Sequence, residues 1–144
     1  MQRSVAGVAL DEHGRVLIGK RKPGGALGSK WEFPGGKLER GEAVADGLQR
    51  EFQEELAVEI AVGPRLASAE FSHKGVPFAL EAYAVTLLSR GFELREHERV
   101  EWVAPNRLAR YDLAESDRRL LSELLSGLPA TGSPSRAESP RFSE

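Results

Sequence analysis

The chain has 144 residues, which suits one domain, and 40% of them are apolar and 29% charged, so a disordered chain is excluded. The formal net charge of −2 argues against a nucleic-acid polymer as partner, and no polybasic run is available for a membrane surface. The absence of cysteine excludes disulfides and thiolate metal sites, and no apolar run approaches the ~20 residues of a transmembrane helix, so we expect a cytoplasmic protein.

The first predicted elements are two strands. The apolar runs Val5–Leu10 and Val16–Lys20 are joined by the turn residues 11–14, which predicts a β-hairpin. A glycine-rich loop follows. The alternating tripeptide 31–33 then predicts a short strand that stops at Pro34.

A helix is predicted from Glu42 to Leu56, because apolar residues recur there at every fourth position. Two extended stretches follow, at Val58–Phe71, with a break at residues 63–64, and at Val76–Leu88. Another short strand is predicted at Val100–Val103.

The end of the chain predicts a second helix and a tail. Ser116 or Asp117 could cap a helix that carries four leucines and has Gly127 just past its end. Strands that precede, separate and follow two helices indicate an α/β or α+β domain with a mixed sheet over residues 1–128. Residues 129–144 are rich in Pro and Ser, which predicts a flexible tail.

The predicted central helix carries three acids, Glu51, Glu54 and Glu55, which fall within about 100° of each other and beside its apolar stripe. We therefore expect them to be partly buried. A solvated acidic face is one interpretation. Against it, like charges at this spacing repel, and the helix C-terminus, where Ala57 and Val58 follow, favours cations. A hard divalent cation would reverse these unfavourable effects, and carboxylates without His or Cys suit Mg²⁺ or Mn²⁺.

Paired glycines precede the helix in the run Pro34–Lys37, where the backbone can bend sharply and expose a carbonyl or N–H to a ligand. A simple strand-to-helix turn is the alternative. The run is not a P-loop, because Trp31 and Leu38 stand where that motif needs Gly and Ser or Thr.

The spacing of these features is specific. Gly36 is followed after five residues by Glu42, and after seven more by the run R-E-F-Q-E-E-L-A-V at 50–58. This pattern resembles the Nudix box, G-x5-E-x7-R-E-U-x-E-E-x-G-U, where U is aliphatic or aromatic. Every fixed position matches except Ala57, where the family has Gly. The preceding W-E-F-P-G-G-K-L-E at 31–39 resembles the MutT-like branch of hydrolases of oxidised purine and of pyrimidine triphosphates.

The resemblance covers residues 3 to about 128, weakly after residue 60. It implies a single domain folded as an α/β/α sandwich with a mixed sheet, and Mg²⁺-dependent hydrolysis, with Mn²⁺ as an alternative, of a nucleoside diphosphate linked to another group. It implies that the metal is held by the Gly36 carbonyl and by Glu51, Glu54 and Glu55. It also implies that Arg50 orients Glu51 through a charged hydrogen bond.

Further roles come from the same resemblance. Glu42 would tether the loop to the helix or reach the metal through water. MutT-like members carry another glutamate six residues before a Trp, which corresponds to Glu96 before Trp102. Glu96 would be a base or a metal ligand. It would act together with the catalytic residues of the helix, which are Arg50, Glu51 and Glu54. Glu98 is its rival, and taken alone this stretch is typical of a solvated charged loop.

Five residues are candidates for substrate binding. Arg21 matches a phosphate-contacting Arg of MutT-like enzymes, and Lys37 lies beside the metal loop, although either is also compatible with a surface cation. Phe33 and Phe78 could line a base pocket or belong to the core. Asp117 falls where MutT-like enzymes place a base-reading Asn or Asp, and a carboxylate there would favour guanine or cytosine, because it only accepts hydrogen bonds. Its alternative role is that of a helix N-terminal acid.

Ala57 puts one detail of the site in question. Glycine after a helix commonly takes a left-handed conformation, in which alanine costs about 1 kcal/mol. Either the cap is strained, or the backbone relaxes and shifts Glu55. The three histidines have no metal-ligand spacing and are expected at turns or on the surface; they are His13, His73 and His97.

We therefore expect a hydrolase that converts a nucleoside triphosphate to the monophosphate and pyrophosphate. Oxidised (d)GTP is the leading substrate, followed by CTP or a modified dCTP, and then by a nucleotide sugar. A nucleotide-binding regulatory module with weak catalysis and an acidic structural helix in a scaffold are the rivals from other classes. We expect a monomer or homodimer, a nucleotide as its partner, and neither a nucleic-acid polymer nor a membrane.

Overall fold

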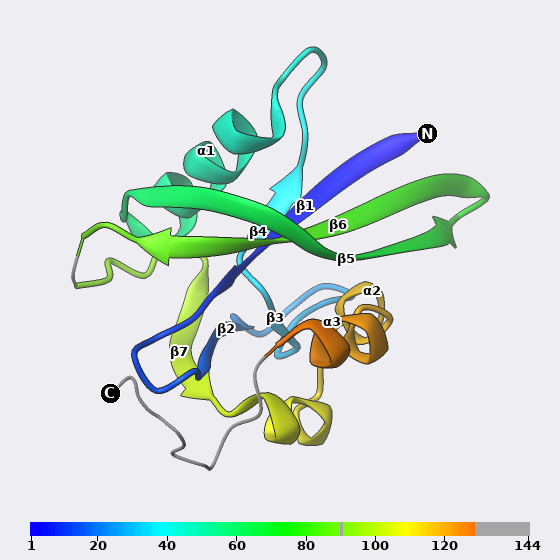
Figure 1. Ribbon diagram of the computed structural model, residues 1–144. Helices are drawn as coiled ribbons and strands as arrows, with labels where there is room; N and C mark the ends of the chain where they lie inside the picture. The colour runs from blue at the N-terminus through cyan, green and yellow to red at the C-terminus, as the bar shows by residue number, and fades with distance from the viewer. Residues whose placement is uncertain (90, 129–144) are drawn as a thin grey trace.

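The computed structural model describes residues 1–89 and 91–128, which form two β-sheets flanked by helices (Figure 1). Four strands make up the first sheet, in the order β4-β1-β6-β5. They are β1 (Gln2–Ala9), β4 (Gly35–Lys37), β5 (Ile60–His73) and β6 (Val76–Leu87). Strand β1 runs parallel to β6, whereas the other two pairings are antiparallel. The prediction of a mixed sheet is confirmed.

The second sheet is antiparallel, in the order β3-β2-β7, and consists of β2 (Val16–Arg21), β3 (Trp31–Glu32) and β7 (His97–Val103). The predicted hairpin is therefore wrong beyond its turn. The Gly14 N–H does donate to the Asp11 carbonyl at 3.0 Å, but only Leu10 and Val16 pair before β1 and β2 enter different sheets. Both strands have apolar side chains at consecutive positions, so apolar side chains point to both faces of each strand and must be buried there. A two-stranded hairpin on its own cannot bury both faces.

Helices cover opposite faces of the first sheet. Helix α1 (Val44–Leu56) lies on one side, and η1 (Pro105–Arg110), α2 (Glu115–Arg118) and α3 (Leu121–Gly127) lie on the other (Figure 1). None of these helices is long and apolar enough to span a membrane. The predicted α/β/α arrangement is confirmed.

The single C-terminal helix predicted with a Ser116 or Asp117 cap is wrong. The structure has two short helices, and α2 follows Ala114 without a side-chain cap. The physical reason is that the Asp117 carboxylate is engaged elsewhere, because it accepts the Phe33 N–H at 2.8 Å. The predicted tail at 129–144 lies outside the described residues.

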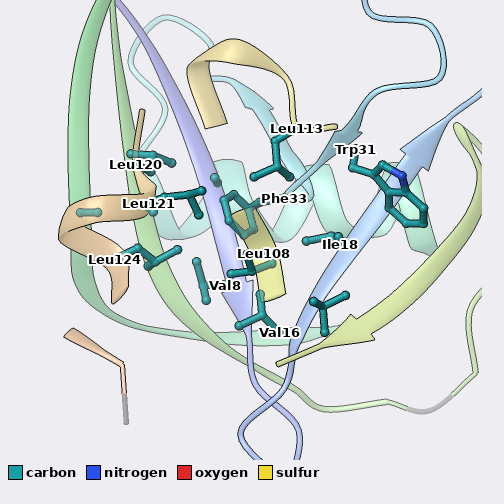
Figure 2. Close-up of a cluster of buried hydrophobic side chains, with 14 of the residues drawn as sticks. Val8, Val16, Ile18, Trp31, Phe33, Leu108, Leu113, Leu120, Leu121 and Leu124 are labelled. Carbon is teal, nitrogen blue, oxygen red and sulfur yellow. The ribbon is translucent and has the colours of Figure 1, made fainter. Parts of the chain in front are cut away.

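Two apolar cores share the strands between them. On the α3 side, Ala6 and Val8 of β1 pack with leucines of η1 and α3 (Figure 2). On the α1 side, Val5 and Ala9 of the same strand pack with the buried face of α1, which consists of Leu48, Phe52 and Leu56. The alternation of β1 thus attaches the central helix to one face of the sheet and the C-terminal helices to the other.

The long hairpin β5–β6 confirms both extended stretches predicted after the helix. The register of the pair shifts between Val62 and Ala67, which is where Gly63 and Pro64 predicted a break. Strand β7 begins at His97, three residues earlier than predicted. This extension brings His97 beside Arg21 of β2.

Candidate active site

The C-terminal end of α1 departs from ordinary backbone geometry. Ala57 adopts the left-handed conformation, with φ 58° and ψ 41°, and its N–H donates to the Gln53 carbonyl at 3.1 Å. The helix cap is therefore strained rather than relaxed, by about 1 kcal/mol relative to glycine. Of the two alternatives, the structure has the left-handed cap rather than a relaxed backbone.

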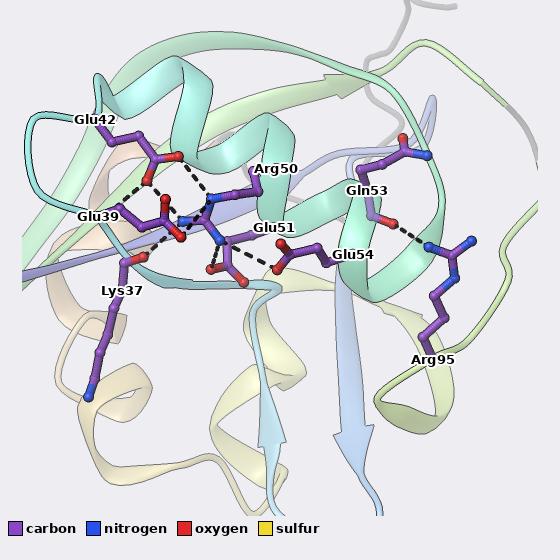
Figure 3. Close-up of polar contacts among 8 residues, drawn as sticks. All are labelled: Lys37, Glu39, Glu42, Arg50, Glu51, Gln53, Glu54 and Arg95. Carbon is purple, nitrogen blue, oxygen red and sulfur yellow. Dashed lines mark hydrogen bonds and ion pairs between the residues drawn. The ribbon is translucent and has the colours of Figure 1, made fainter.

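A distant segment stabilises this helix end. The last turn of α1 contains no basic residue, but Arg95 Nη1 donates to the Gln53 carbonyl at 3.2 Å (Figure 3). The Arg95 N–H also donates to the Glu55 carbonyl at 3.2 Å, and the Glu93 N–H donates to that of Leu56 at 3.0 Å. Arg95 thus places a positive charge at the negative end of the helix dipole and fixes the segment before β7 to α1.

Arg50 organises the acids around the helix (Figure 3). Its Nε and Nη2 donate to the two Glu42 carboxylate oxygens at 2.8 and 2.9 Å, and its Nη1 donates to Glu51 Oε2 at 2.9 Å. Nη2 also reaches the Lys37 carbonyl at 3.1 Å. The same guanidinium therefore orients Glu51 and ties the loop before the helix, as the resemblance implies for Arg50 and Glu42.

Glu42 is held as an anion by this arrangement. The Arg50 hydrogen bonds, together with the Glu39 N–H at 2.9 Å, lower the pKa of the Glu42 carboxyl to about 2. In return, the Glu42 and Glu51 carboxylates raise the pKa of Arg50. The pair therefore stays charged across the physiological range of pH.

Gly36 leaves room for the Glu51 carboxylate. A Cβ at this position would lie 2.6 Å from Glu51 Cδ, closer than real Cβ atoms approach. Strand β4 therefore brings its backbone directly against the side chain. This contact brings the Gly36 backbone and the Glu51 carboxylate together, two of the groups that the resemblance assigns to a metal.

The three helix acids lie in different environments. The Glu51 side chain is 13% exposed and Glu54 is 54% exposed, with Glu54 at a distance of 3.4 Å from Arg50. The expectation that all three would be partly buried is therefore wrong for Glu54, which points to solvent at the end of the stripe. Glu55 is buried, at 2% exposure.

Glu55 is the most perturbed acid of the site. Its Oε1 is buried, with no hydrogen-bond partner among residues 1–89 and 91–128. Burial raises the pKa of the Glu55 carboxyl to about 10, and a hydrogen bond with Glu51 and the charges of Glu32 and Glu96 add to the shift. Without a cation Glu55 is thus neutral at pH 7, whereas a nearby cation would favour its ionised form.

Glu55 faces two further residues. One ligand atom each from Glu32, Glu55 and His97 lie within 4.8 Å of one another, and His97 Nε2 is 2.9 Å from Glu32 Oε2. The expectation of a turn or surface site is wrong for His97, which is 1% exposed. His13 does lie in a turn and His73 is exposed, as expected. The acids of this region can hold a divalent cation.

A family model described as NUDIX domain matches residues 5–123. The chain belongs to the Nudix family. It is 31% identical over 121 residues to CTP pyrophosphohydrolase of Escherichia coli, covering 84% of this chain and 90% of that protein. It is 35% identical over 112 residues, 76% of this chain and 78% of the relative, to a Mycobacterium tuberculosis protein provisionally named 8-oxo-dGTP diphosphatase 2.

The solution structure of the E. coli ORF135 protein is similar, with a TM-score of 0.77 and 30% identity over 88% of this chain and 89% of that one. These similarities confirm the fold class and the resemblance to MutT-like Nudix hydrolases. The protein is thus an enzyme of the Nudix hydrolase family.

The cations predicted to bind phosphate already have partners in this Nudix hydrolase. Arg21 Nη1 donates to Glu32 Oε2 at 3.2 Å. Lys37 Nζ lies 5.7 Å from the centre of the Phe78 ring, which stacks on Phe71 at 5.3 Å between ring centres. Phe78 is only half-buried, so its ring is not a sealed core residue.

Of the remaining predicted site residues, one belongs to the apolar core, and the others offer carboxyl groups. Phe33 is 3% exposed and belongs to the α3-side core. Its N–H binds Asp117, whose pKa is raised by burial to about 7. Near neutral pH Asp117 therefore exists in both protonation states, so it can donate as well as accept. Glu96 is exposed, and its rival Glu98 pairs with Lys20 at 3.4 Å.

Sequence reasoning missed Glu32 and His97 in this Nudix site. The alternation of 31–33 carried the signal for Glu32, because Trp31 and Phe33 point to one face and Glu32 must point to the other. His97 carried no such signal. Its position depends on where β7 begins and on Gly19 across the sheet, where a Cβ would lie 2.7 Å from the His97 ring.

Proposed function

We propose that this Nudix hydrolase cleaves nucleoside triphosphates with Mg²⁺ or Mn²⁺, so that one water and one triphosphate give the monophosphate and pyrophosphate. The observation that carries the proposal is the buried Glu55, which has no partner for Oε1 among residues 1–89 and 91–128, beside Glu51 packed on Gly36. An acid in that position is unfavourable unless a cation binds it.

The donor set fits a hard cation. Glu51, Glu54, Glu55 and the Gly36 carbonyl offer oxygen atoms, which Mg²⁺ and Mn²⁺ prefer. When bound, the cation neutralises phosphate charge and lowers the pKa of water. The chain orients these donors itself, because Arg50 holds Glu51 through one hydrogen bond and the preceding loop through Glu42 and the Lys37 carbonyl.

Glu96 is the proposed proton acceptor. It directly follows Arg95, which is bound to the end of α1, and its charge is near enough to raise the pKa of Glu55. An exposed carboxylate there can take a proton from water and release it to solvent. Arg21 and Lys37 are the proposed phosphate contacts, and Arg21 would exchange its Glu32 partner for a phosphate oxygen.

We propose oxidised (d)GTP as the leading substrate. The relative provisionally named 8-oxo-dGTP diphosphatase 2 supports it, as does Asp117, which can bind donors on a guanine edge. The half-buried Phe78 offers a ring on which a base can stack. CTP or a modified dCTP is the second candidate, because the E. coli relative named CTP pyrophosphohydrolase is matched over 90% of its length.

A panel of nucleotides tests the proposal. Purified protein with Mg²⁺ is incubated with 8-oxo-dGTP, dGTP, CTP, a modified dCTP and a nucleotide sugar, and the release of pyrophosphate and monophosphate is measured. We expect equal amounts of both products, with 8-oxo-dGTP turned over fastest. Nucleotide binding without turnover of any substrate would instead support the weakly catalytic regulatory module and contradict the proposed function.

A further inference from the structure

We propose that Glu32, Glu55 and His97 form an inner cation site of their own, in which a histidine nitrogen selects a transition ion such as Mn²⁺. The donors of the proposed function, at Glu51, Glu54 and the Gly36 carbonyl, are called the outer donors. The inference rests on the proposed function only in that Glu55 is shared between the two sites.

The geometry fits one ion. The three ligand atoms lie within 4.8 Å of one another, and one pair, His97 Nε2 and Glu32 Oε2, is 2.9 Å apart. Ligands of an octahedral ion at about 2.1 Å are about 3 Å apart when adjacent and about 4.2 Å apart when opposite. A small contraction would therefore bring all three to bonding distance.

The cluster contains a buried oxygen without a partner in the described part of the chain. Glu55 Oε1 and His97 Nδ1 are buried with no hydrogen bond to any described residue. Glu55 is 2% exposed and His97 is 1% exposed, so neither side chain forms hydrogen bonds with bulk water. His97 faces Glu32 through Nε2, so the atom that a cation in this cluster would satisfy is Glu55 Oε1. A buried polar atom without a partner is uncommon unless something binds there.

Neighbouring residues hold the three ligands of the cluster in place. Because Gly19 has no side chain, the His97 ring can pack directly on the β2 backbone. Arg95 fixes the segment before His97 to the helix that carries Glu55. Arg21 donates to Glu32 at 3.2 Å and offsets its charge while no cation is bound. Three segments distant in sequence are thus held around one point.

The nitrogen ligand distinguishes this inner site from the outer acids. Mg²⁺ prefers oxygen ligands, whereas Mn²⁺ and later first-row ions also accept imidazole. The outer donors at Glu51, Glu54 and Gly36 are all oxygens. Mn²⁺ should therefore occupy the inner site at concentrations where Mg²⁺ does not.

Mn²⁺ alone is the probe, measured by pulsed electron paramagnetic resonance on the full chain without a histidine tag. The chain has three histidines, and the exposed His13 and His73 are first replaced by Gln, so that His97 is the one imidazole left. We expect ¹⁴N coupling to bound Mn²⁺ in this background. His97→Asn should abolish the coupling and leave one ion fewer bound, while the outer ion stays.

Bound Mn²⁺ without ¹⁴N coupling, or coupling that survives His97→Asn, would overturn the inner site. Should His97→Asn fail to fold, Glu32→Gln serves in its place and should weaken Mn²⁺ binding at the nitrogen site by about 10- to 100-fold. The nucleotide panel separates the two proposals. Turnover with Mg²⁺ but no nitrogen coupling refutes only the inner site, and coupling without turnover refutes only the proposed function.

Discussion

The backbone N–H of Phe33 donates to Asp117 Oδ2 at 2.8 Å and joins the loop after β3 to the short helix α2. The acceptor is 7% exposed, and Ser116 Oγ donates to its other oxygen at 3.2 Å. This one carboxyl therefore fixes the C-terminal helices on the sheet and lies at the proposed base pocket.

Asp117→Asn should change how stability depends on pH. Burial raises the pKa of Asp117 from 3.8 to about 7, so the folded protein keeps a proton there that the unfolded chain releases. Stability from this residue is thus full below pH ~3.8 and is lost as the pH rises to about 7. The Tm of Asp117→Asn relative to the native chain should rise between pH 4 and pH 8. Asp112→Asn, at an exposed acid, should show no such trend.

Arg50→Lys should reduce kcat by about 10- to 100-fold, the usual effect of losing a residue that orients metal ligands. Lysine keeps the charge but cannot make the paired hydrogen bonds to Glu42 while also binding Glu51. Steady-state kinetics checks this, with the exposed Arg40→Lys as the matched control. Equal kcat in both variants would show that the Arg50 network is not needed to orient Glu51.

Ala57→Gly should stabilise the protein by about 1 kcal/mol, because glycine adopts the left-handed conformation at φ 58° without strain. Tm from thermal unfolding should rise by a few degrees. The same substitution at the exposed Ala45 inside α1 should have the opposite sign, with a loss of about 0.5–1 kcal/mol. A lower Tm for Ala57→Gly would mean that the cap is not strained.

Glu54→Gln should leave the fold intact, because this acid is 54% exposed and its one ion pair is long. It should nevertheless lower kcat by orders of magnitude and reduce the rise of Tm that we expect Mg²⁺ to produce in the native chain. The exposed Glu59→Gln, just beyond the helix, should behave like the native chain in both measurements. Native turnover in Glu54→Gln would remove this residue from the metal site.

The elements with a strong local pattern were predictable from the sequence. The fourfold apolar recurrence located α1 within two residues, and the break at Gly63-Pro64 located the irregularity of β5. The partition of β1 and β2 into different sheets was not predictable, because the turn between them is compatible with either outcome. The role of the Asp117 carboxylate was not predictable either, because it depends on a contact with Phe33, 84 residues away in the chain.

The candidate site divides in the same way. The three helix acids were predicted from their spacing, and Gly36, Glu42 and Arg50 from the resemblance, because the pattern that these residues form is local in the sequence. Glu32 and His97 were missed since they meet Glu55 only after β3, α1 and β7 have packed. Arg95 was missed for the same reason, because its binding to the α1 carbonyls joins residues 42 apart in the chain.

Strand β1 supplies alternate side chains to both cores, Val5 and Ala9 beneath α1 and Ala6 and Val8 beneath the C-terminal helices. It thus lies between the proposed metal site on one side and the proposed base pocket on the other. Directed evolution toward new nucleobases would therefore have to keep the sequence of β1. The substitutions would have to be made in α2, the nearby loops and the start of β6.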